Sequence, residues 1–363
     1  MQRRNKPFLL VFFTLLLLVF WPQESQAATP QISAQAAVLI DARNGQILYE
    51  KKAHQPLPPA SCGKIITAIT AMEMADSDQF CWISKNVEKV GEASIDLREG
   101  DVYTLEELLK GALIKSGNDA CYAIGENLAG SEPFFVYWLN LKSLAIGAFS
   151  ANLQNTNGLP AENHVISAYD LALAARYAMR NDLFASIVRS KFAQIGSQST
   201  ARSLKNTNKL LWQDEAITGI KTGTTDAAGA CLVASWEQSG RQLIAVVFHS
   251  PDRYAESLKL LRYGADETLF FDLAKKGEII AAVHVKKGHK ELLPLVSASD
   301  IYYCYKKEDR DGLHIQWQIK DKLSAPVEKN ELVGQVMILD KANNILAKSD
   351  LLAAERIEKK GFF

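Results

Sequence analysis

The spacing of the apolar residues changes near Gly277, and this change divides the chain into two parts. Before it, segments with apolar residues at helical spacing are interspersed with segments typical of strands. After it, short alternating runs such as EIIAAVHVKK, LHIQWQIK and VGQVMILDK are separated by turns at 309–312 and 343–344. The pattern predicts an α+β domain followed by a small all-β domain.

The length and the charge balance narrow the class of protein. A chain of 363 residues with 48% hydrophobic content can bury two cores of ordinary size. Its 41 basic and 41 acidic residues give a formal net charge of zero, which argues against a broad basic surface for nucleic acid. The sequence has no Cys and His spacing typical of zinc sites. We therefore expect a globular protein that binds neither nucleic acid nor metal.

The N-terminus has the features of a secretory signal peptide. Basic residues precede the apolar run PFLLVFFTLLLLVFW, and the small-residue site Ser25-Gln26-Ala27 lies before Ala28. The apolar core spans about 14 residues, fewer than the roughly 20 that a helix needs to cross a bilayer. We expect residues 1–27 to direct export to the periplasm or cell-wall space, with a permanent anchor as the alternative. The two domains would then span residues 28–276 and 277–363.

The cysteines do not form a disulfide pattern, although export would permit one. They are odd in number and widely spaced, at positions 62, 81, 121, 231 and 304. We interpret most of them as small buried hydrophobic residues. Cys62 follows Ser61, and on a helix its side chain would point about 100° away from that serine.

Two flanking segments frame the first domain. The stretch AAVLIDARNGQILYEK has two apolar runs joined by Asn44-Gly45, which predicts a β-hairpin. Residues 252–275 have helical spacing and are expected to close the domain.

The segment PPASCGKIITAITAMEMAD contains the first candidate for catalysis. The two prolines end the preceding extended segment, and the apolar residues that follow recur at helical spacing. Ser61 therefore lies at or near a helix N-terminus, with Lys64 three residues later on the same face. The helix N-terminus favours negative charge on the serine oxygen. To take the proton of Ser61, Lys64 needs its pKa lowered from about 10.4 by burial or a second cation. The alternative is an ordinary charge on the first helical turn.

The segment DVYTLEELLKGALIKSGNDACYAIGENLAG places Ser116-Gly117-Asn118 between two helices. Thr104 and Glu107 form a capping box before an apolar run that ends near Ile114. A second helix begins after Asn118. Taken alone, such a loop is an ordinary turn.

The segment AITGIKTGTTDAAGACLVASWEQSGRQLIAVVFHS predicts paired strands. GACLVASW and RQLIAVVF flank a turn at 238–240, and GIKTGTT lies just before them. In an extended strand, Lys221 and Gly223 lie on one face and Thr222 on the other. A glycine there lets a substrate backbone come close, while the lysine supplies a cation.

These three pieces occur together in one order. Ser-x-x-Lys at a helix start, Ser-x-Asn in an inter-helix loop and Lys-Thr-Gly on a strand are the signature set of the penicillin-interacting serine enzymes. The chain resembles the serine-type D-alanyl-D-alanine carboxypeptidases, the low-molecular-mass penicillin-binding proteins. The similarity extends through NTNGLPAENHVISAYDLALAARYAM and the C-terminal region. It implies a penicillin-binding/β-lactamase-like catalytic domain, an antiparallel sheet flanked by helices.

The resemblance also implies a reaction and its participants. The enzyme would remove the terminal D-Ala from peptidoglycan pentapeptide stems through an acyl-enzyme, with β-lactam antibiotics as covalent inhibitors and without a cofactor. Ser61 would be the nucleophile and Lys64 its base, and Ser116 would relay a proton to the departing amine.

The remaining site residues would bind the substrate. Asn118 would hold the peptide through its amide, and Lys221 would lower the pKa of Lys64. The backbone N–H groups of Ser61 and Thr224 would form the oxyanion hole. The terminal carboxylate would be bound by Lys221, Thr222 and Thr224, and Arg253 would assist unless it is only an exposed residue at a helix start.

Three alternatives remain at the level of sequence. A class A β-lactamase would need an Asp in place of Gly117 and a Glu-containing deacylation loop, and the sequence has neither. A non-catalytic sensor would be acylated by antibiotic without turning over peptide. A Ser-His-Asp hydrolase is disfavoured because no serine lies in a Gly-x-Ser-x-Gly elbow.

Membrane contact is the least determined feature. Members of the resembled family commonly continue into a C-terminal amphipathic helix, whereas this chain stops at DLLAAERIEKKGFF. That segment offers little apolar area for an interface, so peripheral membrane contact stays open.

Overall fold

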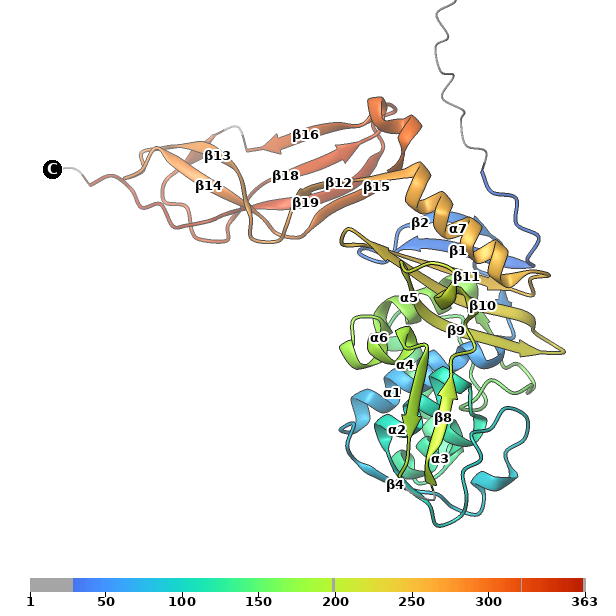
Figure 1. The fold of residues 1–363 in the computed structure, drawn as a ribbon. Coiled ribbons are helices and arrows are strands. Elements are labelled where there is room, and N and C mark those ends of the chain that lie inside the picture. Colours follow the sequence, from blue (N-terminus) through green and yellow to red (C-terminus); the bar gives the residue numbers. More distant parts are fainter. Residues whose placement is uncertain (1–28, 198–199, 321, 362–363) are drawn as a thin grey trace, which may run out of the picture.

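The structure consists of a mixed helix-and-strand domain and an elongated β-rich domain that extends from it to one side (Figure 1). This computed structural model describes residues 29–197, 200–320 and 322–361. The predicted signal peptide lies outside the described residues. Among the helices of the described part, none is long and apolar enough to cross a membrane. The α+β class and the β-rich C-terminal part are confirmed.

A five-stranded antiparallel sheet forms the centre of the first domain, in the order β2-β1-β11-β10-β9. Its strands are β1 (Ala36–Asp41), β2 (Ile47–Lys51), β9 (Ile217–Thr225), β10 (Gly229–Gln238) and β11 (Arg241–Phe248). Asn44-Gly45 joins β1 to β2 as predicted. The predicted pairing of β10 with β11 is also confirmed, with Gln238 opposite Arg241 across the turn.

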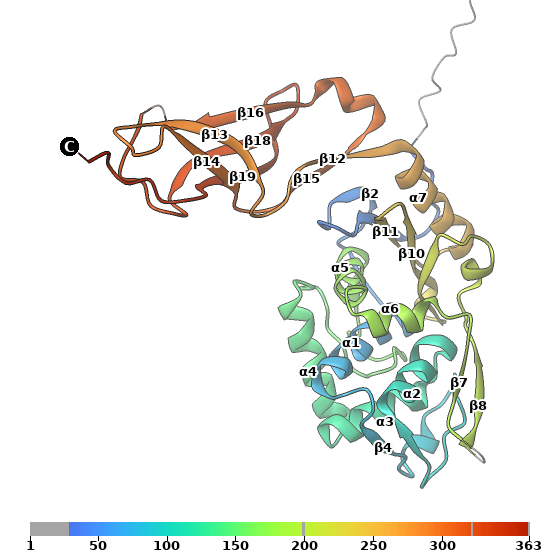
Figure 2. The same ribbon diagram turned by 60° about the vertical axis from the view of Figure 1, so that its left-hand side comes forward.

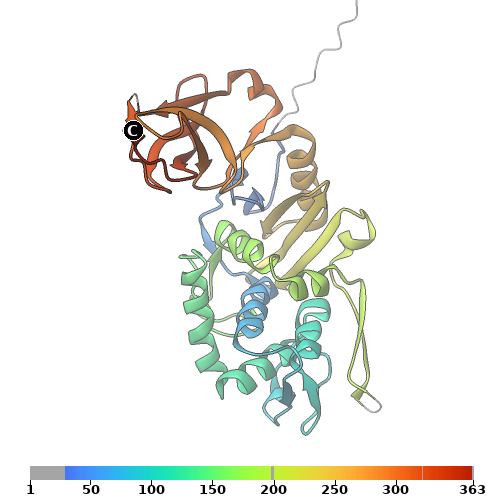
Figure 3. The ribbon, with the colours of Figure 1, turned by 90° about the vertical axis from the view of Figure 1, so that its left-hand side faces the viewer.

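Both faces of this sheet are buried. In β11, Ile244 and Val246 belong to the larger core, while Leu243 and Ala245 belong to a second core that includes residues of α7 (Arg253–Glu267). Figure 3 shows the sheet lying between α7 and the other helices. A strand that is buried on both faces needs apolar residues at successive positions, which explains the unbroken apolar run LIAVVF of β11.

The remaining elements cover the opposite face of the sheet and the lower part of the domain (Figure 2). The helices are α1 (Lys64–Met74), α2 (Leu105–Lys110), α3 (Asn118–Ala129), α4 (Glu132–Ala145), α5 (Ala168–Ala178) and α6 (Asp182–Arg189). Short helical turns are η1 (Ala60–Gly63), η2 (Val87–Lys89), the π-helical η3 (Gly111–Lys115) and η5 (Lys209–Trp212). Three two-stranded pairs are β3 (Pro56–Leu57) with β6 (Ile166–Ser167), β4 (Phe80–Trp82) with β5 (Val102–Thr104), and β7 (Phe192–Ile195) with β8 (Arg202–Lys205).

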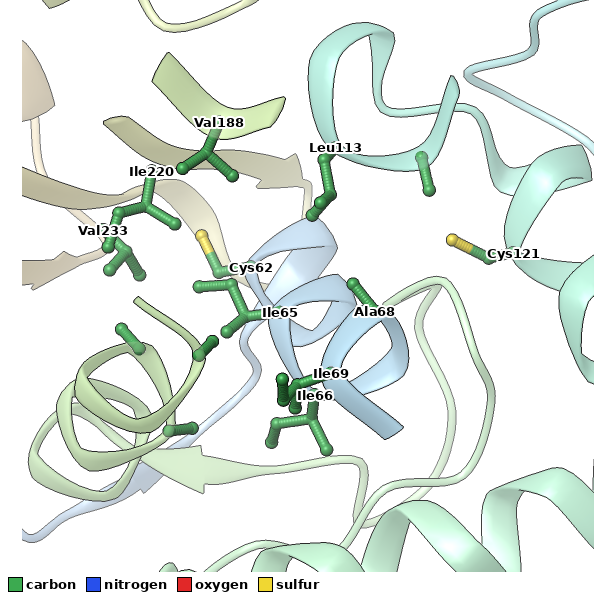
Figure 4. Packing of buried hydrophobic residues seen from close by; sticks show 14 of the residues in the cluster. Cys62, Ile65, Ile66, Ala68, Ile69, Leu113, Cys121, Val188, Ile220 and Val233 are labelled. Carbon is green, nitrogen blue, oxygen red and sulfur yellow. The ribbon is translucent and has the colours of Figure 1, made fainter. Parts of the chain in front are cut away.

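Helix α1 lies at the centre of the larger core. Every residue from Lys64 to Ala71 is buried. Figure 4 shows Cys62 and Ile65 on the side of Ile220 and Val233, which come from the sheet. Because α1 is packed on all sides, its first turn is held in a fixed place relative to β9.

The second domain has its own sheet and its own hydrophobic core. The sheet order is β16-β18-β19-β14-β13-β17, and β12 pairs with β15 beside it. These strands are β12 (Thr268–Ala274), β13 (Ile279–Lys286), β14 (Leu292–Ser297), β15 (Ile301–Lys306), β16 (His314–Ile319), β17 (Leu323–Ser324), β18 (Leu332–Leu339) and β19 (Ile345–Ala353), with the turn η6 (Lys307–Gly312) between β15 and β16.

The helix that was expected over residues 252–275 is shorter than predicted. Helix α7 ends at Glu267, and residues 268–274 form β12, which pairs with β15 of the second domain. Within TLFFDLA, the exposed Phe270 and Asp272 alternate with partly buried residues, which are Leu269, Phe271 and Leu273. Residues 268–274 therefore form a strand paired with β15, although the helical spacing of the preceding residues predicted that the helix would continue.

A buried polar network joins the two domains. Asp41, at the end of β1, is fully buried, and its Oδ2 accepts hydrogen bonds from Arg241 Nε at 3.1 Å and Tyr302 OH at 3.0 Å. The Cys304 thiol lies 3.1 Å from the same oxygen. The Gln46 side chain adds two hydrogen bonds to the backbone of Cys304, at 2.6 and 2.8 Å. The Asn44-Gly45 hairpin thus docks the second domain.

Candidate active site

Ser61 lies in a tight turn before α1, in η1. It is partly exposed, whereas Ala60, Cys62 and Gly63 around it are buried. Ala60 has a φ of +47°, in the left-handed region. The turn therefore presents the Ser61 hydroxyl outward at the start of the buried helix.

The Lys64 ammonium is surrounded by oxygen acceptors. It lies 2.7 Å from Ser61 Oγ, 2.7 Å from Asn118 Oδ1 and 2.6 Å from the Asn157 carbonyl oxygen. These three contacts use all three hydrogens of an ammonium. On loss of a proton, Lys64 keeps two fixed partners, and its lone pair can accept from the Ser61 hydroxyl. The predicted pairing of Ser61 with Lys64 is therefore present in the structure.

The second lysine approaches Ser116 from the sheet. Lys221 Nζ donates to Ser116 Oγ and to the Thr222 carbonyl, both at 2.9 Å. Ser116 has a φ of +73° and is 8% exposed, so the loop between η3 and α3 turns its hydroxyl toward β9. The three motifs that are far apart in sequence therefore meet at one site.

Burial lowers the pKa of both lysines. Lys64 is 0% exposed and Lys221 is 1% exposed. Burial is the main cause that lowers the pKa of Lys64 to about 8. Burial, followed by the charge of Lys64, lowers the pKa of Lys221 to about 7. Burial is thus the main cause for both lysines, and the repulsion between the two cations adds to it across the pair.

Asn118 is occupied by contacts within the protein. Its Oδ1 accepts from Lys64, and its Nδ2 donates to the Gly91 carbonyl at 2.9 Å. Its backbone N–H donates to the Ala93 carbonyl at 2.7 Å. Asn118 therefore holds Lys64 in place and ties the 91–93 loop to the site, in addition to any contact with a peptide.

The Lys-Thr-Gly strand passes directly over the Ser61 turn. A Cβ added at Gly223 would lie 2.9 Å from the backbone nitrogen of Ser61. The glycine was expected to let a substrate backbone approach, but the backbone that it admits is that of residues 60–62. Thr222 lies on the other face, as predicted, with its Oγ1 2.7 Å from Thr207 Oγ1.

Arg253 joins the far end of this strand. It begins α7, and its Nη1 donates to the Gly223 carbonyl and to Thr224 Oγ1, both at 2.7 Å. Thr224 is exposed, and Arg253 is partly exposed. A guanidinium and a hydroxyl are therefore available together at the open end of β9, where an anionic group could bind.

Cys62 does not take part in the polar cluster. It is fully buried, its thiol faces the Lys221 carbonyl at 3.4 Å, and burial raises its pKa to about 12. A thiol of this kind stays protonated and unreactive. All five cysteines are free and buried, as predicted for most of them.

Sequence reasoning missed the residues that support the site from below. Asn157 supplies its carbonyl to Lys64, and Gly158 passes close beneath Ala60. Asp119 is buried and accepts hydrogen bonds from the backbone of Ile95 and Leu97, which holds the loop in front of the site. The segment NTNGLP carried the only signal for Gly158, because Asn-Gly marks a tight turn.

Gly158→Ala is expected to destabilise the protein by about 3 kcal/mol and to slow acylation, because a left-handed alanine costs free energy and its Cβ would collide with Ala60. Gly158 has a φ of +87°, and an added Cβ would lie 1.9 Å from the Ala60 carbonyl oxygen. The matched control is Gly130→Ala, which has a φ of +76° and no atom within 4 Å of the added Cβ. The control should lose only about 1 kcal/mol. Thermal unfolding measures both variants, and equal losses would contradict the close contact.

Two family models match the chain. The model described as D-alanyl-D-alanine carboxypeptidase matches residues 23–252, and the model of the penicillin-binding protein 5 C-terminal domain matches residues 271–359. The two matches together cover nearly all of the described residues, and the gap between them contains the whole of α7.

Curated relatives and solved structures agree with these matches. The chain is 32% identical to D-alanyl-D-alanine carboxypeptidase DacF of Bacillus subtilis, over 96% of this chain and 93% of that protein. It is 29% identical to DacD of Salmonella typhimurium, over 92% of this chain and 89% of that protein. Penicillin binding protein 5 of Haemophilus influenzae superposes with a TM-score of 0.81 at 26% identity, covering 91% of this chain and 99% of that one. PBP3 of Streptococcus pneumoniae superposes with a TM-score of 0.74 at 26% identity, covering 91% of this chain and 100% of that one.

Proposed function

The chain belongs to the D-alanyl-D-alanine carboxypeptidase family, and from this premise we propose that Ser61, Lys64 and Ser116 carry out the reaction of that family. The enzyme is a serine-type carboxypeptidase of the penicillin-binding class. The observation that carries the assignment of residues is the 2.7 Å contact between Ser61 Oγ and a fully buried Lys64 ammonium.

In the acylation step, neutral Lys64 accepts the proton of Ser61 as Oγ attacks the carbonyl carbon of the penultimate D-Ala. The backbone N–H groups of Ser61 and Thr224 stabilise the negative charge that develops on the carbonyl oxygen. Each donor of this kind lowers the activation free energy by about 3 kcal/mol. Asn118 and the Asn157 carbonyl keep the Lys64 amine aimed at Ser61 throughout.

Departure of the terminal D-Ala requires a proton on its amine nitrogen. Ser116 relays this proton from the protonated Lys64 to the amine, so that Lys64 is neutral again before deacylation. Lys221 Nζ, 2.9 Å from Ser116 Oγ, holds the relaying hydroxyl in place. The C–N bond breaks, and the remaining peptide stays as an ester on Ser61. Water then attacks the ester, and Lys64 accepts the proton of that water and returns one to Ser61. Every step uses residues of this chain.

The terminal carboxylate of the substrate binds at the open end of β9. Thr224 offers an exposed hydroxyl there and Arg253 a positive charge, with further positive charge from the buried Lys221. The Thr222 hydroxyl is already paired with Thr207 Oγ1. Arg253 is already held against Thr224 at 2.7 Å, so its guanidinium needs little ordering when the anion arrives. This position fixes which peptide bond reaches Ser61.

The substrate is a peptidoglycan stem peptide that ends in D-Ala-D-Ala, and β-lactams acylate the same serine. Peptidoglycan lies outside the cytoplasm, so residues 1–27 act as the export signal. Neither a β-lactamase-like hydrolase nor a non-catalytic sensor is favoured by the family matches.

The function is tested by mass spectrometry after incubation with diacetyl-lysyl-D-Ala-D-Ala, and separately with penicillin. Release of D-alanine and a slowly hydrolysed adduct on Ser61 are expected. An adduct without any D-alanine release would support a sensor, and rapid penicillin hydrolysis would support a β-lactamase.

We place the division between the two domains after Glu267, because β12 pairs with β15. A protein of residues 29–267 should keep penicillin acylation of Ser61 within a few-fold, because all the proposed catalytic residues precede the cut. It should unfold at a lower temperature, because Asp41 loses Tyr302 and Cys304 as partners. Acylation kinetics and thermal unfolding measure both effects, and a folded truncation that reacts orders of magnitude more slowly would contradict the division.

A further inference from the structure

The segment from residue 183 to residue 213 is strongly basic although the whole chain has a formal net charge of zero. It contains no Asp or Glu, and its five cations are Arg189, Lys191, Arg202, Lys205 and Lys209. Charge that is concentrated in one segment creates a local positive field, which attracts an anionic partner. The proposed catalytic steps use none of these five residues.

The β7–β8 hairpin displays part of this segment to solvent. Phe192 pairs with Lys205 across the hairpin, so their side chains lie on the same face. Both side chains are exposed, whereas Ile195 and Leu204 on the other face are buried. Figure 2 shows the hairpin running along the side of the first domain.

Trp212 extends this face from η5. Its ring packs edge-on against Phe192, with the centroids 5.9 Å apart at 82°, and Lys205 Nζ lies 5.6 Å from the indole centroid. Phe192 is 61% exposed and Trp212 is 41% exposed. The Phe192, Lys205 and Trp212 group is therefore an exposed aromatic surface with a cation over the indole ring.

The same surface continues to the carboxylate-binding end of the active site. Lys209, also in η5, lies 5.9 Å from the Tyr254 ring, and Arg253 lies 5.2 Å from that ring. The Tyr254 hydroxyl donates to the Thr207 carbonyl at 3.1 Å. Thr207 in turn contacts Thr222 of β9. Arg253 and Lys209 therefore supply positive charge on the path from the active site to Trp212, along which an anionic polymer could bind.

We propose that Phe192, Lys205, Lys209 and Trp212 form an accessory site, the basic aromatic surface, that binds peptidoglycan as a polymer. This inference rests on the proposed function and goes beyond it, because a short stem peptide does not require such a surface. The carboxylates of neighbouring stem peptides pair with the lysines. The C–H faces of the sugar rings pack on the exposed indole and phenyl rings, which offer large contact area at low entropic cost.

A second exposed aromatic pair provides a matched control. On α4, Phe134 and Trp138 pack edge-on with centroids 6.4 Å apart at 76°, and they are 53% and 40% exposed. Within the described residues, no cation lies over the Trp138 ring. The α4 pair therefore has nearly the same geometry and exposure without a cation over either ring in the described part of the chain.

The test is co-sedimentation of the purified protein with insoluble peptidoglycan sacculi. The double variant Phe192→Ala and Trp212→Ala is expected to bind about tenfold more weakly. Its kcat and KM on the short diacetylated peptide should stay within about twofold, because the surface lies outside the reacting groups. The variant Phe134→Ala and Trp138→Ala should bind sacculi as the unaltered protein does. Short-peptide turnover reports on the proposed function separately from sacculus binding.

A charge variant keeps the proposal testable if the aromatic variant fails to fold. Lys205→Gln with Lys209→Gln should weaken sacculus binding and reduce its dependence on salt, because both lysines are exposed and pair with anions there. Unchanged binding of this folded variant would overturn the proposal. Equal loss in the α4 variant, or binding of wall teichoic acid without binding of purified peptidoglycan, would also overturn it.

Discussion

Replacing Ser61 by alanine is expected to abolish both D-alanine release and penicillin labelling, with a loss of about 10⁴-fold or more. The reason is that Ser61 Oγ is the atom to which the acyl group is attached, and no other hydroxyl lies beside Lys64 Nζ among its hydrogen-bond partners. Intact-protein mass spectrometry after penicillin treatment measures the loss directly.

Two controls make this result specific. The alanine variant should retain its unfolding temperature within a few degrees, because the Ser61 side chain is partly exposed and its neighbours carry the packing. Cys62→Ser should keep its penicillin adduct, because the buried Cys62 thiol, with a pKa raised to about 12, is not the nucleophile. Labelling of Ser61→Ala at the rate of the unaltered enzyme would rule out the assignment.

Lys64→Arg is expected to lower the acylation rate by about 10³-fold, the contribution of a well-placed general base. Arginine stays protonated and cannot accept the proton of Ser61. The matched control is Lys115→Arg, because Lys115 is exposed and lies outside the site. Stopped-flow acylation by a chromogenic β-lactam measures both variants, and an active Lys64→Arg enzyme would defeat the mechanism.

The acylation rate should depend on pH through the protonation of Lys64, the proposed base. Below its pKa, Lys64 is protonated and inactive, so the rate should rise with pH and level off once the amine is neutral. The midpoint should fall between about 7 and 8, because burial lowers the pKa of Lys64 to about 8 and that of Lys221 to about 7. The apparent value belongs to the pair of lysines rather than to either one. A flat profile between about pH 6 and pH 10 would contradict this interpretation.

Local patterns predicted those parts of the fold in which neighbouring residues decide the structure. Asn44-Gly45 and the Thr104–Glu107 capping box specify a turn and a helix start by their own hydrogen bonds, and both occur in the structure. The end of α7 was predicted wrongly because residues 268–274 gain partners from β15, more than 25 residues away in the chain. Helical spacing carries no information about such a partner.

For the active site, the sequence predicted the side chains of the motifs but not the backbone groups that support them. Ser61, Lys64, Ser116 and Lys221 were predicted from the motifs, and the structure brings their side chains together. The sequence named burial and a second cation as the ways to lower the pKa of Lys64, but it could not establish that Lys64 is buried, because burial depends on how α1 packs among distant segments. The Asn157 carbonyl was missed because every residue has one, so the sequence does not mark it.

The buried contacts of Asp41 also fix the orientation of the two domains relative to each other. Tyr302 and Cys304 of the β-rich domain both contact Asp41 of the first domain. The β-rich domain is therefore held against the first domain by buried contacts and is not connected to it by a flexible linker alone. Its β18 and β19 strands have eight and nine residues. At about 3.3 Å per residue, the two strands are about 26 and 30 Å long. The two domains therefore keep one relative orientation, so any surface that bound the far end of the β-rich domain would lie at a fixed distance and direction from Ser61.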